Sequence, residues 1–175
     1  MTFPGAAVAP TINITMANET LADIYQQQLE LVKLHLADFS EEDMLKRPCD
    51  AANHAAWMIG HMLTSEATLI NIATPGAIPE QDAAFRERHS SKGSKLNDGF
   101  LTKPELMTLL IATREKSIEW VEKLSEADMK RDMPPQFENF APTVGHLAHV
   151  VPLHATMHLG QIQAIRRALG KPVLF

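Results

Sequence analysis

The stretch from His146 to Gly170 most constrains what this chain can fold into, because it reads as one long helix. It contains four of the eight histidines, and His154 and His158 lie four residues apart within it. Four residues advance an α-helix by about 400°, so both imidazoles lie on one face. Two histidines at this spacing can hold one metal ion, although the spacing also occurs by chance on half-buried helix faces. A metal site therefore needs a third ligand from elsewhere in the chain.

Three further segments repeat this apolar periodicity, and together they predict four long helices. Asn18 and Asn53 are candidate N-caps, and a single helical turn opens at Ser40. The predicted helices cover about residues 18–38, 53–75, 102–124 and 143–169. We expect residues 1–17 to form an extended N-terminal arm and residues 18–175 to form a single domain.

The second predicted helix is apolar over much of its circumference, which indicates that other helices surround it. The polar connection that follows, from Thr74 to Thr102, is long enough to be a crossover. Two similar stretches 85 residues apart, beginning at Ser40 and Ser125, are each followed by a Gly-His pair. These features predict an all-α fold, a four-helix bundle with a long crossover between helices two and three and with helices two and four side by side.

Pro152 interrupts the histidine-rich helix. Proline removes one backbone hydrogen bond and crowds the carbonyl four residues earlier, so we expect a kink between His149 and His154. Histidines before that point, His146 among them, cannot be placed by ideal helical angles.

Charge and composition disfavour several functional classes. With 16 Lys+Arg against 21 Asp+Glu, the net charge of -5 disfavours nucleic-acid binding, which depends on phosphate neutralisation. No apolar run approaches the ~18 residues of a membrane span, so no membrane partner is expected. The single cysteine, Cys49, cannot form an internal disulfide, and the N-terminus does not resemble a secretory signal. We therefore expect a cytoplasmic protein.

His61 is the best candidate for the third ligand. It lies in the apolar run of helix two, where an imidazole without a partner is costly to bury, so it is either a ligand or a hydrogen-bonded core histidine. His54, two turns earlier on the same face, is placed for helix capping or exposure, with a contact near the site as the alternative. His146 could approach the site if the internal repeat is genuine. His89, in the polar crossover, is expected to be solvated.

The motifs Trp57-x-x-Gly60-His61 and His154-x-x-x-His158-x-Gly160-Gln161 resemble those of the DinB/YfiT-like superfamily. The resemblance covers about residues 18–170 and is most specific in the last forty. It implies a four-helix bundle in which one histidine of helix two and the pair of helix four bind a divalent metal. Carried over to this chain, the ligands are His61, His154 and His158.

Three neutral imidazoles leave coordination positions open, which is typical of catalytic rather than structural sites. Zinc, nickel and iron(II) all suit imidazole ligands. The resemblance implies a metal-dependent enzyme of the thiol-transferase, isomerase or hydrolase type that acts on a small molecule, with a low-molecular-weight thiol as one substrate class. Gln161 is a candidate hydrogen-bond partner of His158, and Glu66 is a candidate carboxylate near the site or a partner of another residue on helix two.

The alternative is a non-catalytic, stress-associated helical bundle whose metal is structural or adventitious. Under either hypothesis, the apolar surfaces of helices one and three predict a homodimer.

Overall fold

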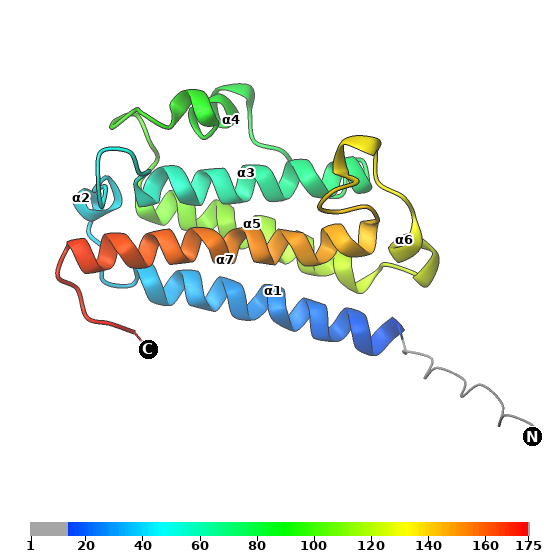
Figure 1. Cartoon of the computed structure of the whole chain (residues 1–175). Helices are drawn as coiled ribbons and strands as arrows, with labels where there is room; N and C mark the ends of the chain where they lie inside the picture. Colours follow the sequence, from blue (N-terminus) through cyan, green and yellow to red (C-terminus); the bar gives the residue numbers. More distant parts are fainter. Residues whose placement is uncertain (1–13, 175) are drawn as a thin grey trace, which may run out of the picture.

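Four long helices form a bundle in the computed structural model, which describes residues 14–174 (Figure 1). Three short helices and two 3-10 turns lie in the connections, and the one β-bridge in this range joins Asp132 to Thr143. The all-α fold predicted from the sequence is confirmed. The elements are α1 Ile14–Leu36, α2 Glu41–Met44, α3 Ala55–Ala73, α4 Ala83–Arg88, η1 Ser91–Gly93, α5 Lys103–Glu122, α6 Glu126–Lys130, η2 Pro135–Phe137 and α7 Val144–Ala168.

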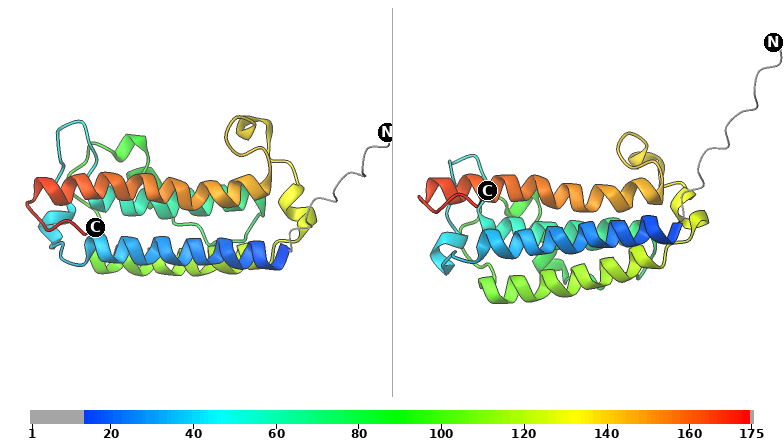
Figure 2. Two further views of the ribbon diagram at one scale, coloured as in Figure 1. Left: turned by 60° about the horizontal axis from the view of Figure 1, so that its bottom comes forward. Right: turned by 90° about the horizontal axis from the view of Figure 1, so that it is seen from below.

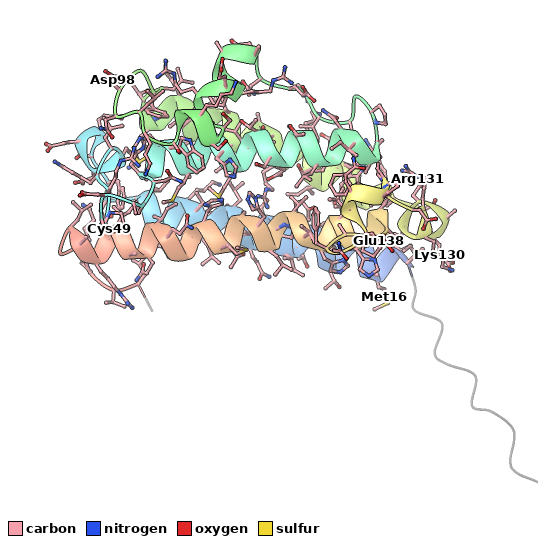
Figure 3. All side chains as sticks on the ribbon, turned by 45° about the horizontal axis from the view of Figure 1, so that its top comes forward. Met16, Cys49, Asp98, Lys130, Arg131 and Glu138 are labelled. Carbon is pink, nitrogen blue, oxygen red and sulfur yellow. The ribbon has the colours of Figure 1, made fainter. Side chains whose placement is uncertain are left out.

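The order of the helices around the bundle explains the crossover. Around the bundle, α3 packs against α5 and α7, and α1 packs against the same two helices (Figures 1 and 2). The neighbours α3 and α5 run parallel, so after α3 ends the chain must return along the whole bundle before α5 can begin. Residues 74–102 make this return over the outer side of α3, and they carry α4 and η1 (Figure 3).

Two predicted helix starts differ from the structure. α1 is already helical at Ile14, the first described residue, so Asn18 lies inside the helix and is not its cap; its buried side chain donates a hydrogen bond to the Leu124 carbonyl at 2.7 Å. α3 is capped by His54 rather than Asn53, because His54 Nδ1 accepts from the Trp57 backbone N–H at 3.1 Å. Of the predicted arm, residues 14–17 are helical and residues 1–13 lie outside the described part of the chain.

The two similar stretches of sequence fold alike. Ser40 and Ser125 each cap a short helix with a reciprocal capping box, in which the partner is Asp43 or Asp128. In each half a long helix precedes the box, and a long helix carrying Gly-His follows it. The internal repeat therefore corresponds to two helix pairs, α1–α3 and α5–α7.

Pro152 lies inside α7, which continues through it to Ala168. The missing N–H of Pro152 leaves the carbonyl of Ala148 without its helical donor. The buried Tyr25 hydroxyl of α1 donates to that carbonyl at 2.9 Å. A side chain from a neighbouring helix thus replaces the lost bond, and α7 does not end at the proline.

Two apolar clusters fill the bundle, one toward α2 and one toward α6, and α3 contributes to both. Between them the Glu66 carboxylate accepts a hydrogen bond from Arg114 at 2.8 Å, with both side chains buried. Arg114 also donates to the Tyr25 carbonyl at 3.2 Å. Within the described range, no helix has the length and apolar character needed to cross a membrane.

Candidate metal centre

Three histidines from two neighbouring helices meet at one point beneath the crossover. His154 and His158 lie one turn apart on α7, and His61 comes from the antiparallel neighbour α3. One ring nitrogen from each lies within 4.8 Å of the other two. The Nε2 atoms of His154 and His158 are 3.2 Å apart, and all three side chains are partly buried. The structure thus brings together the three residues that the sequence singled out.

Hydrogen bonds on the far side of two rings determine which nitrogen faces the cluster. His61 Nδ1 lies 3.1 Å from the carbonyl oxygen of His89, and His158 Nδ1 lies 2.9 Å from Gln161 Oε1. Because both oxygens can only accept, both Nδ1 atoms carry the proton, and the Nε2 atoms keep their lone pairs. An outer hydrogen bond of this kind is the usual way in which proteins orient metal-binding histidines.

Burial keeps the three imidazoles neutral. Burial lowers the pKa of His61. Burial, and to a smaller extent repulsion from His61, lowers the pKa of His154. Burial, and to a smaller extent repulsion from the neighbouring His154, lowers the pKa of His158 to about 4. Neutral imidazole is the form that binds metal, so protons do not compete with an ion at neutral pH.

The crossover holds the His61 ring from outside. Trp57, one turn before His61, stacks on it with ring centroids 4.6 Å apart and planes 10° from parallel. Trp57 Nε1 donates to the Ser90 carbonyl at 3.1 Å, next to the His89 carbonyl that accepts from His61. Two consecutive carbonyls of the crossover therefore fix both rings.

His89 was predicted to be solvated, and the structure contradicts this, because its side chain is only 1% exposed. Its ring lies against Gly60, where a Cβ atom would come within 2.1 Å of it. Sequence reasoning missed this residue because its hydrogen bond to His61 uses the main chain, which carries no sequence signal. The glycine directly before His61 was the one indication that another segment approaches α3 closely.

Other candidate residues lie away from the cluster. His54 is fully buried at the start of α3, and it donates through Nε2 to the Leu96 carbonyl at 3.1 Å. His146 lies in the first turn of α7, where Nδ1 is 2.8 Å from Thr143 Oγ1, so the repeat does not bring it to the site. Glu66 points into the bundle toward Arg114, a residue of α5 rather than of its own helix. Gln161 is the exception among the remaining candidates, because its side chain contacts His158.

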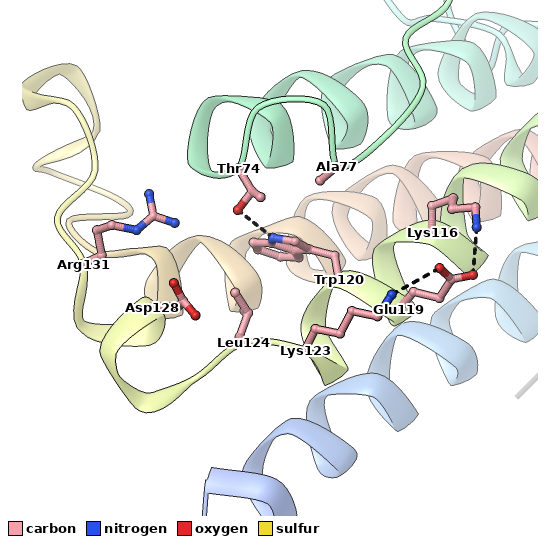
Figure 4. A pocket seen from close by; sticks show the side chains of 9 residues that line it. All are labelled: Thr74, Ala77, Lys116, Glu119, Trp120, Lys123, Leu124, Asp128 and Arg131. Atoms are coloured by element: carbon pink, nitrogen blue, oxygen red, sulfur yellow. Dashed lines mark hydrogen bonds and ion pairs between the residues drawn. The ribbon is translucent and has the colours of Figure 1, made fainter.

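A cavity of about 650 Å³ opens beside the cluster, and His61 and His154 form part of its wall. A second cavity of about 300 Å³ lies near α6 (Figure 4). Its polar groups bind one another: Glu119 pairs with Lys116 and Lys123 at 2.9 and 3.7 Å, and Trp120 Nε1 donates to Thr74 Oγ1 at 2.9 Å. Of these two cavities, the larger is lined by His61 and His154, and the smaller is lined by no histidine.

Comparison with known proteins agrees with this geometry. A family model described as the DinB superfamily matches residues 24–162. The chain is also similar to a solved structure described as a conserved protein from Enterococcus faecalis, with 15% identity and a TM-score of 0.69. That similarity covers 93% of this chain and 100% of the other, and at this identity it concerns the fold alone. No curated protein matches the chain.

Proposed function

The chain belongs to the DinB superfamily, and on that premise we propose that it is a metal-dependent enzyme whose divalent ion is held by His61, His154 and His158. The observation that carries this proposal is the convergence of three ring nitrogens within 4.8 Å. The reaction types that we propose are thiol transfer, isomerisation and hydrolysis on a small molecule, with a low-molecular-weight thiol as one substrate class.

The donor set fits such an ion. His158 carries its proton on Nδ1, so its bare Nε2 faces His154 Nε2 at 3.2 Å. In the metal-free chain a proton on His154 Nε2 can bridge these two nitrogens, and a cation would take the place of that proton. Zinc, nickel and iron(II) are the ions that suit three neutral imidazoles.

An open catalytic site is supported over a closed structural one. Among the described residues the group comprises three histidines, and no cysteine or carboxylate completes it. Structural zinc sites usually have four protein ligands, whereas catalytic sites keep a position for water or substrate. When bound, the ion would polarise a substrate carbonyl or lower the pKa of a bound water or thiol.

The surrounding side chains would orient the ligands and admit the substrate. Gln161 and the His89 carbonyl hold two of the rings, as described above. Ser65 Oγ lies 3.5 Å from His61 Nε2, close enough to contact a molecule bound beside that ring. The cavity gives such a molecule access to His61 and His154.

Cobalt substitution tests the proposal directly. We expect the full-length protein to bind cobalt(II) with a visible spectrum that acetohydroxamate changes, because an open position admits the hydroxamate. His158→Ala should abolish the spectrum, and His146→Ala should leave it intact. A cobalt spectrum that hydroxamate does not alter would support the structural alternative, and no spectrum at all would reject the site.

Dimerisation and a cytoplasmic location remain predictions. Large apolar side chains are exposed on α1, where Met16, Ile24 and Leu34 are 64%, 43% and 44% exposed, and on α7. The exposed large apolar residues of the described chain do not include any of α5. The apolar side chains exposed on α7 line the cavity beside the histidines, so a homodimer would use the surface of α1 rather than those of α1 and α5, and sedimentation of the intact chain would detect it.

A further inference from the structure

The cavity beside the histidines has two different walls. α3 contributes hydroxyl-bearing residues, and α7 with the loop before it contributes large apolar ones, notably Leu153, Met157 and Phe140. Its volume of about 650 Å³ lies in the range of small-molecule sites, about 300–1,000 Å³. A molecule bound at His61 and His154 would therefore extend along α7.

The polar groups of this cavity are largely engaged within the protein. Arg86 is the one residue of the wall with a permanent charge, and it forms an ion pair with Glu80. The Thr64 hydroxyl donates to the Gly60 carbonyl of its own helix at 2.6 Å. A charged or strongly polar substrate tail would find few free partners here and would lose its hydration.

The apolar wall is exposed in the isolated chain. Leu153 is 62% exposed, Met157 69% and Phe140 51%. Large apolar side chains that gather around one hollow mark a binding site more often than an inert surface. On the other flank of Leu153, a groove of about 140 Å³ between α1 and α7 is smaller and has none of the three histidines in its wall. The larger hollow, with two candidate metal ligands in its wall, favours a small molecule over a second protein chain.

We propose that the substrate carries an uncharged apolar group, an alkyl or aryl chain, that lies on α7 against Leu153 and Met157 while its polar head reaches the metal. This inference rests on the proposed metal-dependent function. It assigns substrate specificity to residues that do not themselves bind the ion.

A series of straight-chain hydroxamates, from acetohydroxamate to octanohydroxamate, tests the proposal on the zinc-loaded full-length protein. The head group is constant, so any gain in affinity measured by calorimetry comes from the tail. Each buried methylene should tighten binding roughly two- to fourfold until the cavity is filled. Equal affinities along the series would overturn the inference.

Paired variants locate the tail. The double variant Leu153→Gln/Met157→Gln should bind acetohydroxamate within about twofold of the unchanged protein and lose most of the chain-length dependence. Leu34→Gln is the matched control, because Leu34 is 44% exposed on α1 and does not line the cavity. All three substituted positions are exposed, so the fold should persist, and unfolding temperatures check this. An equal chain-length dependence in all proteins would contradict the assigned wall.

The two proposals fail in different ways. His158→Ala removes a ligand that does not line the cavity, so it should abolish acetohydroxamate binding without changing the apolar wall. If zinc and acetohydroxamate bind but longer tails add nothing, the substrate inference is wrong and the metal proposal stands. If zinc does not bind, the proposed function is wrong whatever the tails do. A dimer that becomes monomeric in the double variant, with no chain-length dependence, would assign the wall to a second copy of the chain.

Discussion

The Nδ1 atom of His158 is 2.9 Å from Gln161 Oε1, and this contact fixes which nitrogen of His158 faces the cluster. We expect Gln161→Leu to weaken zinc binding about 10- to 100-fold, because the ring would lose its orientation and its fixed proton. Gln161→Glu is the matched control, since a carboxylate accepts the same hydrogen bond and should retain the affinity. Competition with a zinc-binding dye measures both. Equal zinc affinities for Gln161→Leu and the unchanged protein would show that Gln161 does not orient the His158 ring for the metal.

His54 makes the folded state sensitive to acid. Burial lowers the pKa of His54 to about 4, whereas in the unfolded chain the usual value is about 6.5. The unfolded state therefore binds more protons as the pH falls below about 6.5, and stability is lost between that pH and about 4. His54→Asn keeps a capping residue but removes this titration. For metal-free protein, its free energy of unfolding should depend less on pH, by on the order of 2 kcal/mol over this range. Parallel pH profiles from urea unfolding would contradict this explanation.

At the residue scale, the sequence predicted most where spacing alone decides geometry. His154 and His158 share a face because α7 is a helix. His61 could be proposed because it interrupts an apolar run and because it belongs to the motif that carries the family resemblance. The burial of His54 and the His89 carbonyl contact were not predicted, because each depends on a segment that folds back from about 30 to 40 residues away.

The contact between α3 and the crossover depends on one glycine. A Cβ atom at Gly60 would lie 2.1 Å from His89 Cδ2, so Gly60→Ala must displace the His89 ring and with it the carbonyl that holds His61. We expect a loss of about 1–3 kcal/mol in stability together with weaker zinc binding. Gly160→Ala on α7 is the control, because a Cβ atom there meets nothing within 4 Å.

The control should be unchanged in zinc affinity and more stable by up to about 1 kcal/mol, since alanine favours a helix. Chemical denaturation and zinc titration of both variants make the comparison. If Gly60→Ala binds zinc as tightly as Gly160→Ala, the crossover does not position His61.

α7 shows why an element can be predicted more reliably than its shape. α7 spans Val144–Ala168 with Gly170 just beyond it, in agreement with the helix predicted over about residues 143–169. A kink at Pro152 was predicted, but the hydrogen bond that replaces the one lost there was not, because Tyr25, which donates to the Ala148 carbonyl, is 123 residues away in the chain. The predicted cap of α3, Asn53, was one residue too early, because the side chain of His54 serves as the cap where asparagine was expected.

At the scale of the whole molecule, Glu66 and Arg114 connect α3 and α5 within the core. Their side chains are 2% and 1% exposed, and Glu66 Oε1 and Arg114 Nε have no hydrogen-bond partner among the described residues. Arg114→Met should therefore cost about 3–5 kcal/mol of stability by leaving a buried carboxylate unpaired. The double variant Glu66→Leu/Arg114→Met should recover most of that loss.

The same pair distinguishes a structural carboxylate from one that serves the metal. Zinc affinity of the folded double variant should equal that of the unchanged protein, because Glu66 points away from the histidines. Urea unfolding and zinc titration provide the two readouts. A large drop in zinc affinity without a drop in stability would place Glu66 at the site.

The architecture as a whole was predictable in outline. A helix that is apolar nearly all round must be surrounded, and a long connection permits parallel neighbours, so the bundle and its crossover followed. The path of the crossover was not predictable, because its anchors are carbonyl groups such as those of His89, Ser90 and Leu96. These main-chain contacts place the crossover over α3, and its residues Arg86, His89 and Ser90 line one side of the cavity.

The most direct test of the central claim is the metal content of full-length protein purified without an affinity tag. We predict close to one divalent ion per chain by elemental analysis, retained in His146→Ala and lost in His158→Ala, because three neutral imidazoles converge on one point. Less than about a tenth of an ion per chain, with no rise in unfolding temperature when zinc or nickel is added, would contradict it.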